Sequence, residues 1–163
     1  MNILALDPGH LTGLMYIRWE GRKRPVVVLE RGFFREKELR FVLDRIFRHN
    51  PPDRILIERT HAHPVEGRTI RWMEDRRNIP YTIHPHLMHA ILFGRLLGNR
   101  DEEGQRIRMD VAKEYGIRGV LSLHELDALL LIHFFLYEAE KRHADIEDPM
   151  WFYDVIRKQQ QSI

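Results

Sequence analysis

The chain has no cysteine among its 163 residues, so disulfide bonds and thiolate metal sites are both excluded. It also has no apolar run near the ~18 residues that a membrane span needs, and its first residues are not built like a signal peptide. An excess of one charge is lacking too, because 26 Lys and Arg against 24 Asp and Glu leave only +2. These absences favour a cytoplasmic protein without a membrane partner, and the net charge alone does not indicate a nucleic-acid partner.

What the sequence does contain is 44% apolar residues, enough for the core of one folded domain. Its positive charge is mostly arginine, which suits bidentate contacts to phosphate. Four arginines gather around Trp72 in RTIRWMEDRR. Taken singly, each is also compatible with a solvated helix face, and a high Arg and Glu content is typical of thermophilic sources as well.

The first half of the chain predicts a sheet that begins with an antiparallel meander. Short apolar or β-branched runs with brief connections predict strands over 2–7, 12–19 and 25–34. Apolar residues then recur at intervals of three and four over 36–49, which predicts an amphipathic helix. The continuous apolar run at 53–58 predicts a fourth strand, covered on both faces.

The second half adds helices and one short strand. Its strongest helix is predicted over 122–144, with Ser122 as the N-cap. The segment 86–99 is ambiguous, and its glycines favour a loop or a bent element. The other expected elements are a loop at 61–67, a helix at 68–77, a strand at 79–85, a helix at 101–116, and a short docked helix with a frayed end within 148–163. The order, without the ambiguous and C-terminal segments, is β-β-β-α-β-α-β-α-α, which predicts a mixed sheet with helices over both faces.

Two of the predicted strands end on a carboxylate. Asp7 closes the first strand before a Pro-Gly turn, and Glu58 closes the fourth. His124 and Asp127 are three residues apart, so they share one face in the first turn of the strongest helix. If that helix begins over the carboxyl ends of the two strands, three carboxylates and an imidazole converge.

Such a cluster is stable only when protons or cations neutralise it, and oxygen ligands suit Mg²⁺ or Mn²⁺. Two such ions can activate a water and stabilise the leaving oxygen of a phosphodiester. In this hypothesis Asp7 bridges both ions, Glu58 holds one, and Asp127 holds the other. Each residue also has a simpler interpretation. Asp7 is then a turn former, and Glu58 is a surface residue at the end of a strand. His124 and Asp127 are then charges that are favoured at a helix N-terminus.

Three segments resemble motifs of a known family. ILALDPG followed by TG resembles the first motif of the RuvC family of Holliday-junction resolvases, within the RNase H-like superfamily. PDRILIE resembles that family's fourth strand with its catalytic Glu, and HELDALLLIHFFL resembles its last helix, where an acidic or His residue precedes a catalytic Asp. The resemblance covers roughly residues 1–140. It implies a single nuclease domain over 1–163, with 144–163 as a C-terminal extension.

The resemblance implies an α/β, RNase H-like fold: a five-stranded mixed sheet, with three antiparallel strands and parallel additions, flanked by helices. It implies that Asp7, Glu58, His124 and Asp127 are catalytic and bind two Mg²⁺ ions, for which Mn²⁺ can substitute, and that His124 binds a metal or orients the attacking water. The family's enzymes are homodimers that nick opposing strands of a four-way DNA junction symmetrically, leaving 5′-phosphate and 3′-hydroxyl ends, in DNA recombination and repair. So compact a chain would suit a phage-encoded resolvase.

The chain departs from the family where DNA contacts are expected. The turn between DPG and TG contains only His10 and Leu11, and the segment 86–99 with its flank keeps Arg95 and Arg100 but no lysine. The loop after Glu58 offers histidines where family members often insert an aromatic residue. The predicted DNA-binding residues are His61, His63, Arg68, Arg71, Arg76, Arg77, Arg95 and Arg100.

Alternatives remain open at this stage. The helix at 68–77 is either an ordinary amphipathic helix or a dimer interface that buries Ile70 with Trp72 or Met73. The protein itself is either a junction resolvase, an RNase H-like nuclease for RNA–DNA hybrids or other branched DNA, or a non-catalytic nucleic-acid-binding relative. Clustered negative charge near phosphates gives a pure binding module no benefit, which favours an enzyme.

Overall fold

The computed structural model describes residues 1–161, without the side chains of residues 159 and 160. Its centre is a five-stranded sheet in the order β3-β2-β1-β4-β5. The strands β1 (Asn2–Asp7), β2 (Thr12–Arg18) and β3 (Val27–Phe34) are antiparallel, and β4 (Arg54–Glu58) and β5 (Tyr81–Ile83) add in parallel to β1. The predicted fold class, a mixed sheet with a three-stranded meander, is confirmed.

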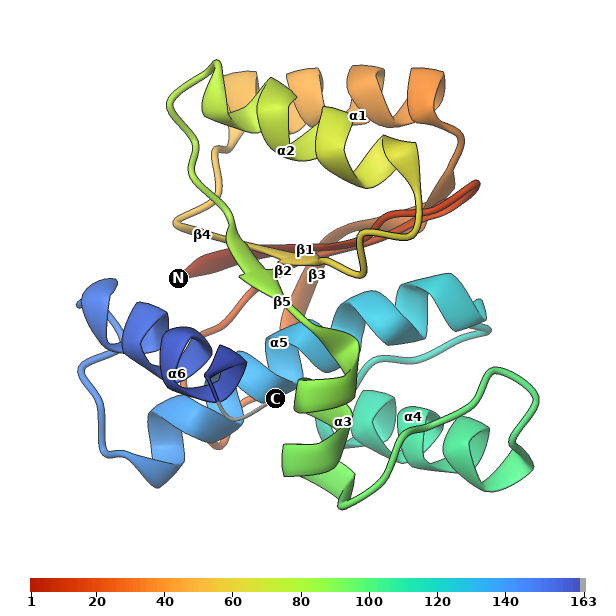
Figure 1. Ribbon diagram of the computed structural model, residues 1–163, viewed down its shortest axis with the longest axis vertical. Helices are drawn as coiled ribbons and strands as arrows, with labels where there is room; N and C mark the ends of the chain where they lie inside the picture. The colour runs from red at the N-terminus through yellow and green to blue at the C-terminus, as the bar shows by residue number, and fades with distance from the viewer. Residues whose placement is uncertain (162–163) are drawn as a thin grey trace.

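Helices cover both faces of this sheet (Figure 1). On one face lie α1 (Glu36–His49) and α2 (Pro64–Glu74). On the other face α5 (Leu123–Lys141) crosses β1, β2, β3 and β4. Around α5 lie α3 (Pro85–Phe93), α4 (Glu102–Glu114) and α6 (Met150–Gln160).

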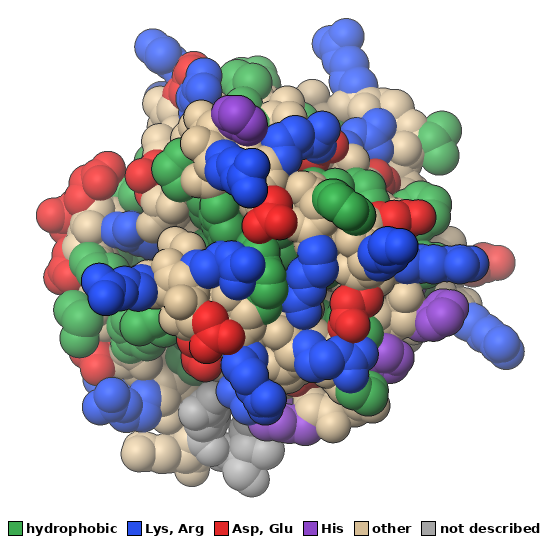
Figure 2. Space-filling model, turned by 90° about the horizontal axis from the view of Figure 1, so that it is seen from above, with side chains coloured by type: hydrophobic (Ala, Val, Ile, Leu, Met, Phe, Trp, Pro, Cys, Tyr) green, Lys and Arg blue, Asp and Glu red, His purple; other side chains and the backbone are tan. Residues whose placement is uncertain are grey.

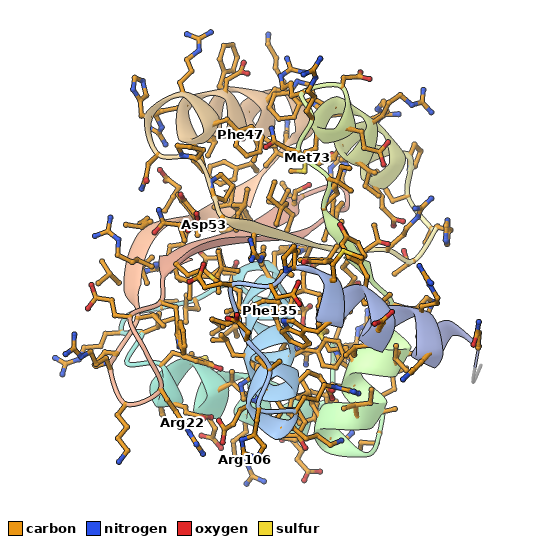
Figure 3. All side chains as sticks on the ribbon, turned by 90° about the vertical axis from the view of Figure 1, so that its left-hand side faces the viewer. Arg22, Phe47, Asp53, Met73, Arg106 and Phe135 are labelled. Carbon is orange, nitrogen blue, oxygen red and sulfur yellow. The ribbon has the colours of Figure 1, made fainter. Side chains whose placement is uncertain are left out.

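The alternation of side chains along β1 produces two separate cores. Ile3 and Ala5 point into the layer beneath α5, whereas Leu4 and Leu6 point into the layer beneath α1 and α2. This is the two-residue period of a strand buried on both faces. In Figure 3, Phe47 and Met73 lie on the α1 and α2 side of the sheet, and Phe135 lies on the α5 side.

Two segments are more helical than the sequence predicts. The helix α2 begins at Pro64 rather than at residue 68, so residues 64–67 of the expected loop at 61–67 are helical. The ambiguous segment forms α3, and its Gly94, at φ 71°, ends that helix in the left-handed conformation that glycine favours. The docked C-terminal helix is present as α6, while residues 162–163 of the expected frayed end lie outside the described residues.

The burial of α2 bears on the two interpretations of this helix, an ordinary amphipathic helix or a dimer interface. Ile70 and Met73 pack into the chain's own core, against α1 and the sheet, so neither is available to a partner. Trp72 is partly buried and stacks on Phe47 of α1 at 5.6 Å between ring centroids. Within residues 1–161, no helix is both long and apolar enough to cross a membrane.

Candidate active site at the carboxyl ends of β1 and β4

Asp7 and Glu58 lie at the same edge of the sheet, on neighbouring strands. The parallel register pairs Ala5 with Leu56 and Leu6 with Ile57, so each carboxylate follows the last registered pair. The chain then turns away after both residues, through Pro8-Gly9 and through the loop before α2. The sequence pattern thus places the two carboxyl groups side by side, as expected for parallel strands.

The first turn of α5 reaches this edge because Gly13 has no side chain. A Cβ atom on Gly13 would lie 1.9 Å from the carbonyl oxygen of His124, which is far inside van der Waals contact. Gly13 is paired with Asp7 across the β1–β2 ladder. The close approach of the two backbones therefore brings the start of α5 against the strand end that carries Asp7.

The same turn of α5 is fixed by a capping box and an arginine. The Ser122 side chain accepts a hydrogen bond from the Glu125 amide at 3.1 Å, and the Glu125 carboxylate accepts one from the Ser122 amide at 2.8 Å. Arg31 of β3 donates to both Glu125 oxygens at 3.2 Å and to the Val120 carbonyl at 3.1 Å. Because two orphan amides are satisfied, His124 and Asp127 sit on a well-anchored turn.

One cleft of about 300 Å³ joins all four residues that the sequence singles out. His124 and Asp127 enter it from α5, and the two strand-end carboxylates enter it from the sheet. The ring of His124 lies 6.3 Å from that of Phe33 on β3. The lining residues are Asp7, Pro8, Gly9, His10, Leu11, Glu58, Asn99, Leu123, His124 and Asp127.

The two strand-end carboxyl groups favour the protonated form. Burial, followed by the negative charge of Asp127, raises the pKa of Asp7 from 3.8 to about 7. Burial, followed by the charge of Asp7, raises the pKa of Glu58 from 4.5 to about 9. A hydrogen bond between the two carboxyl groups accompanies these shifts. Without a cation, this pair holds a proton near neutral pH.

Asp127 has a different partner, which the sequence analysis missed. Arg108 of α4 donates from Nε to Oδ1 of Asp127 at 2.7 Å, and its side chain is only 1% exposed. Burial raises the pKa of Asp127, while the charge and hydrogen bond of Arg108 lower it. A signal was present in the sequence: Arg108 interrupts the face of α4 that buries Gly104 and Val111 at helical spacing.

Glu66 of α2 is a further carboxylate close to the site. It is 3% exposed and accepts hydrogen bonds from Thr60 N at 3.0 Å, Thr60 Oγ1 at 3.2 Å and His61 N at 3.1 Å. Its charge adds to the rise in the pKa of both Asp7 and Glu58. Its hydrogen bonds to Thr60 and His61 hold the loop that follows Glu58 in place, and His61 in this loop has a φ of 61°.

The donor set fits a divalent cation in part. Asp7 and Glu58 offer only oxygen ligands, and a cation between them would replace the proton that they now share. Asp127 is already paired with Arg108. Within residues 1–161, no group of three or more His, Asp or Glu side chains converges as a metal centre. The expected four-residue, two-ion centre is therefore not preformed, whereas the Asp7–Glu58 pair suits one ion.

The predicted DNA-binding arginines within α2 and in the turn that follows it belong to the side of the molecule formed by α1 and α2, where Lys and Arg side chains are widespread (Figure 2). Arg68 pairs with Glu36 of α1 at 3.0 Å, and Arg76 lies over the Trp72 ring at 3.9 Å. Arg71 and Arg77 are exposed, as are His61 and Arg100. His63 caps α2 through its ring nitrogen, and Arg95 is held by Asp101 and Glu103.

The mixed sheet with its carboxylate cleft defines an RNase H-like fold of the type found in junction resolvases. RuvC of Thermus thermophilus matches with a TM-score of 0.64 at 18% identity, covering 86% of this chain and 96% of that chain. T. thermophilus RuvC in complex with a Holliday-junction substrate matches with a TM-score of 0.65 at 16% identity, and the match covers 89% of this chain and 98% of that chain. The fowlpox virus resolvase, in complex with its substrate Holliday-junction DNA, matches with a TM-score of 0.53 at 13% identity, and the match covers 85% of this chain and 99% of that chain.

The sequence itself matches no family model and no curated protein. The structural likenesses nevertheless span most of both chains in each comparison. The chain therefore has the RuvC fold, and the resemblance that its motifs carry is confirmed at the level of fold.

Proposed function

We propose that this protein is a metal-dependent endonuclease that resolves four-way DNA junctions. The observation that carries the proposal is the single cleft that gathers Asp7, Glu58, His124 and Asp127 from two strands and one helix. The fold supports it, because solved structures with this fold include resolvases described with Holliday-junction DNA. The products we expect are symmetric nicks with 5′-phosphate and 3′-hydroxyl ends.

In this proposal each residue has a distinct role. Asp7 is central, since burial and then the charge of Asp127 raise its pKa and a hydrogen bond with Glu58 lowers it. Together with Glu58 it holds a divalent ion, Mg²⁺ or Mn²⁺, which when bound supplies charge stabilisation and an activated water. His124 lines the same cleft and orients the attacking water. Residues 8–11 line the same cleft.

The proposed substrate is held by the arginine-rich face of α1 and α2, because arginine suits phosphate contacts.

Symmetric cutting needs two active sites, so we propose that the protein acts as a homodimer. Ile70 and Met73 are buried within the chain, so neither side chain takes part in that contact. We further propose that residues 1–163 act as one nuclease domain, with 144–163 as its extension.

The deciding experiment offers the protein three substrates: a mobile four-way junction, the matching linear duplex and an RNA–DNA hybrid. Each is incubated with Mg²⁺, with Mn²⁺ or with EDTA, and the products are mapped on sequencing gels. We expect paired nicks at symmetric positions in the junction alone, and none in EDTA. Cleavage of the hybrid alone would refute junction resolution and favour an RNase H-like activity.

The same assay tests the site. Asp7→Asn should abolish cleavage while leaving junction binding unchanged or tighter, because a negative charge near phosphates is removed. Asp110→Asn is a matched control, since this carboxylate lies on α4 with its side chain 64% exposed. Wild-type cleavage by Asp7→Asn in Mg²⁺ would show that the site is assigned wrongly.

A further inference from the structure

We propose that Arg108 takes the place of a second cation at Asp127, so that the DNA-free protein binds one divalent ion per chain, at Asp7 and Glu58. The inference rests on the proposed function only in treating these carboxylates as metal ligands. It differs from the two-ion site that the sequence motifs imply, because one of the four ligands is already neutralised by a side chain of the protein itself.

The guanidinium of Arg108 is held at all three nitrogens. Its Nε donates to Oδ1 of Asp127 at 2.7 Å, its Nη1 to the carbonyl of Gly98 at 3.4 Å, and its Nη2 to the carbonyl of Leu97 at 3.3 Å. The side chain is 1% exposed, and that of Asp127 is 15% exposed. The positive charge is thus fixed next to Asp127 rather than drawn there from solvent.

The helix also keeps space for this side chain. Gly104 lies one turn before Arg108 in α4, and a Cβ atom there would lie 3.2 Å from Nη1 of Arg108 and 3.1 Å from Oδ2 of Asp101. Glycine inside a helix costs about 1 kcal/mol relative to alanine. The three atoms nearest to an added Cβ all belong to Arg108 and Asp101, so the absence of a side chain at Gly104 leaves room for the buried guanidinium and its neighbour.

A guanidinium and a divalent ion compete for the same carboxylate. If an ion bound Asp127, Arg108 would remain buried without its acidic partner and beside a doubly charged cation, a costly arrangement. At Asp7 and Glu58 the situation differs, because the Nε hydrogen bond and the ion pair of Arg108 are made with Asp127 and not with either of these carboxylates. The first ion therefore meets less competition there than at Asp127.

The test counts Mn²⁺ ions bound to the full chain without DNA, by isothermal titration calorimetry and by electron paramagnetic resonance of the unbound ion. We expect one ion per chain for the wild type and two for Arg108→Gln. Asp127→Asn should keep the single ion, whereas Asp7→Asn should lose it. Arg106→Gln is the matched control: it removes the same charge from the same helix, but its side chain is 72% exposed and lies at the outer edge of the molecule (Figure 3).

Several results would overturn the proposal: two ions or none on the wild type, loss of the ion in Asp127→Asn, or an unchanged count in Arg108→Gln. If Arg108→Gln does not unfold cooperatively, and is therefore not properly folded, the number of Mn²⁺ ions bound by the wild type and by Arg108→Lys decides. Lysine keeps the positive charge, so Arg108→Lys should still bind one ion per chain. A purely structural ion pair would alter thermal stability without altering the count. Since no DNA is present, failure to cut junctions would refute the proposed function and leave this result standing.

Discussion

Replacing Asp7 by Asn should stabilise the metal-free protein, although Asp7 is the proposed centre of the site. Burial, and then the charge of Asp127, raises the pKa of Asp7 from 3.8 to about 7. Between these values the folded chain binds a proton that the unfolded chain has released. The contribution of Asp7 to the free energy of unfolding of the wild type therefore falls as pH rises from about 4 to about 7 and stays low above that, while the contribution of Glu58 continues to fall up to its own pKa of about 9. Asn has no such charge to bury.

The size of the gain follows from the same shift. One pKa unit corresponds to about 1.4 kcal/mol, so the full shift sets an upper value of about 4 kcal/mol above pH 7. The cleft is open to water, which screens part of this. We expect Asp7→Asn to raise the free energy of unfolding by about 2 kcal/mol at pH 8 and by about 1 kcal/mol at pH 5.

Urea denaturation in EDTA at pH 5, 6, 7 and 8 measures this difference, with Asp110→Asn as the exposed control. A gain of ~2 kcal/mol corresponds to a rise in Tm of about 4–8 °C for a chain of this size. Saturating Mn²⁺ should reverse the order, because binding at 100 times Kd stabilises the wild type by about 2.7 kcal/mol. A variant that is no more stable than wild type at pH 8, or whose gain is the same at every pH, would refute the reasoning.

Two further predictions concern the approach of α5 and the basic face. Gly13→Ala should lower the free energy of unfolding, measured by urea denaturation, by about 3 kcal/mol or more, because its Cβ would overlap the His124 carbonyl. Gly67→Ala is the control: its Cβ meets nothing within 4 Å, so this change should raise the free energy of unfolding by about 0.5–1 kcal/mol. Arg71→Gln should weaken junction binding in gel-shift titrations, and it should reduce the slope of the logarithm of the binding constant against the logarithm of the salt concentration by about one. An unchanged slope would exclude a phosphate contact by Arg71.

The sheet was predictable because its signals are local. Each strand is a short apolar run with a clear end, and α1 has the same bounds in the sequence pattern as in the structure. The start of α2 was missed because Pro64 was read as part of a loop, although proline suits the first helical position and His63 accepts from the Val65 amide at 3.3 Å. In α3 the glycine at 94 was read as a bend, whereas it ends a helix that begins at Pro85.

The candidate site was predictable only in part, for a related reason. Carboxylates that end apolar strands are visible in a sequence, and parallel strands place them at one edge. The partner of Asp127 is not visible in the same way, because an arginine on an amphipathic helix usually faces solvent. The packing of α4 against α5 shows directly that Arg108 is buried and paired with Asp127.

The cleft draws its side chains from the first strand, the fourth strand and the fifth helix, so it is assembled entirely from contacts between distant parts of the chain. Such contacts carry the largest entropic cost of closure and form late in folding. A chain still being synthesised, or one in which α5 has loosened from Gly13, holds its carboxylates apart. The four side chains therefore share one cleft only in the finished fold, and the hydrolysis proposed above would be restricted to that state.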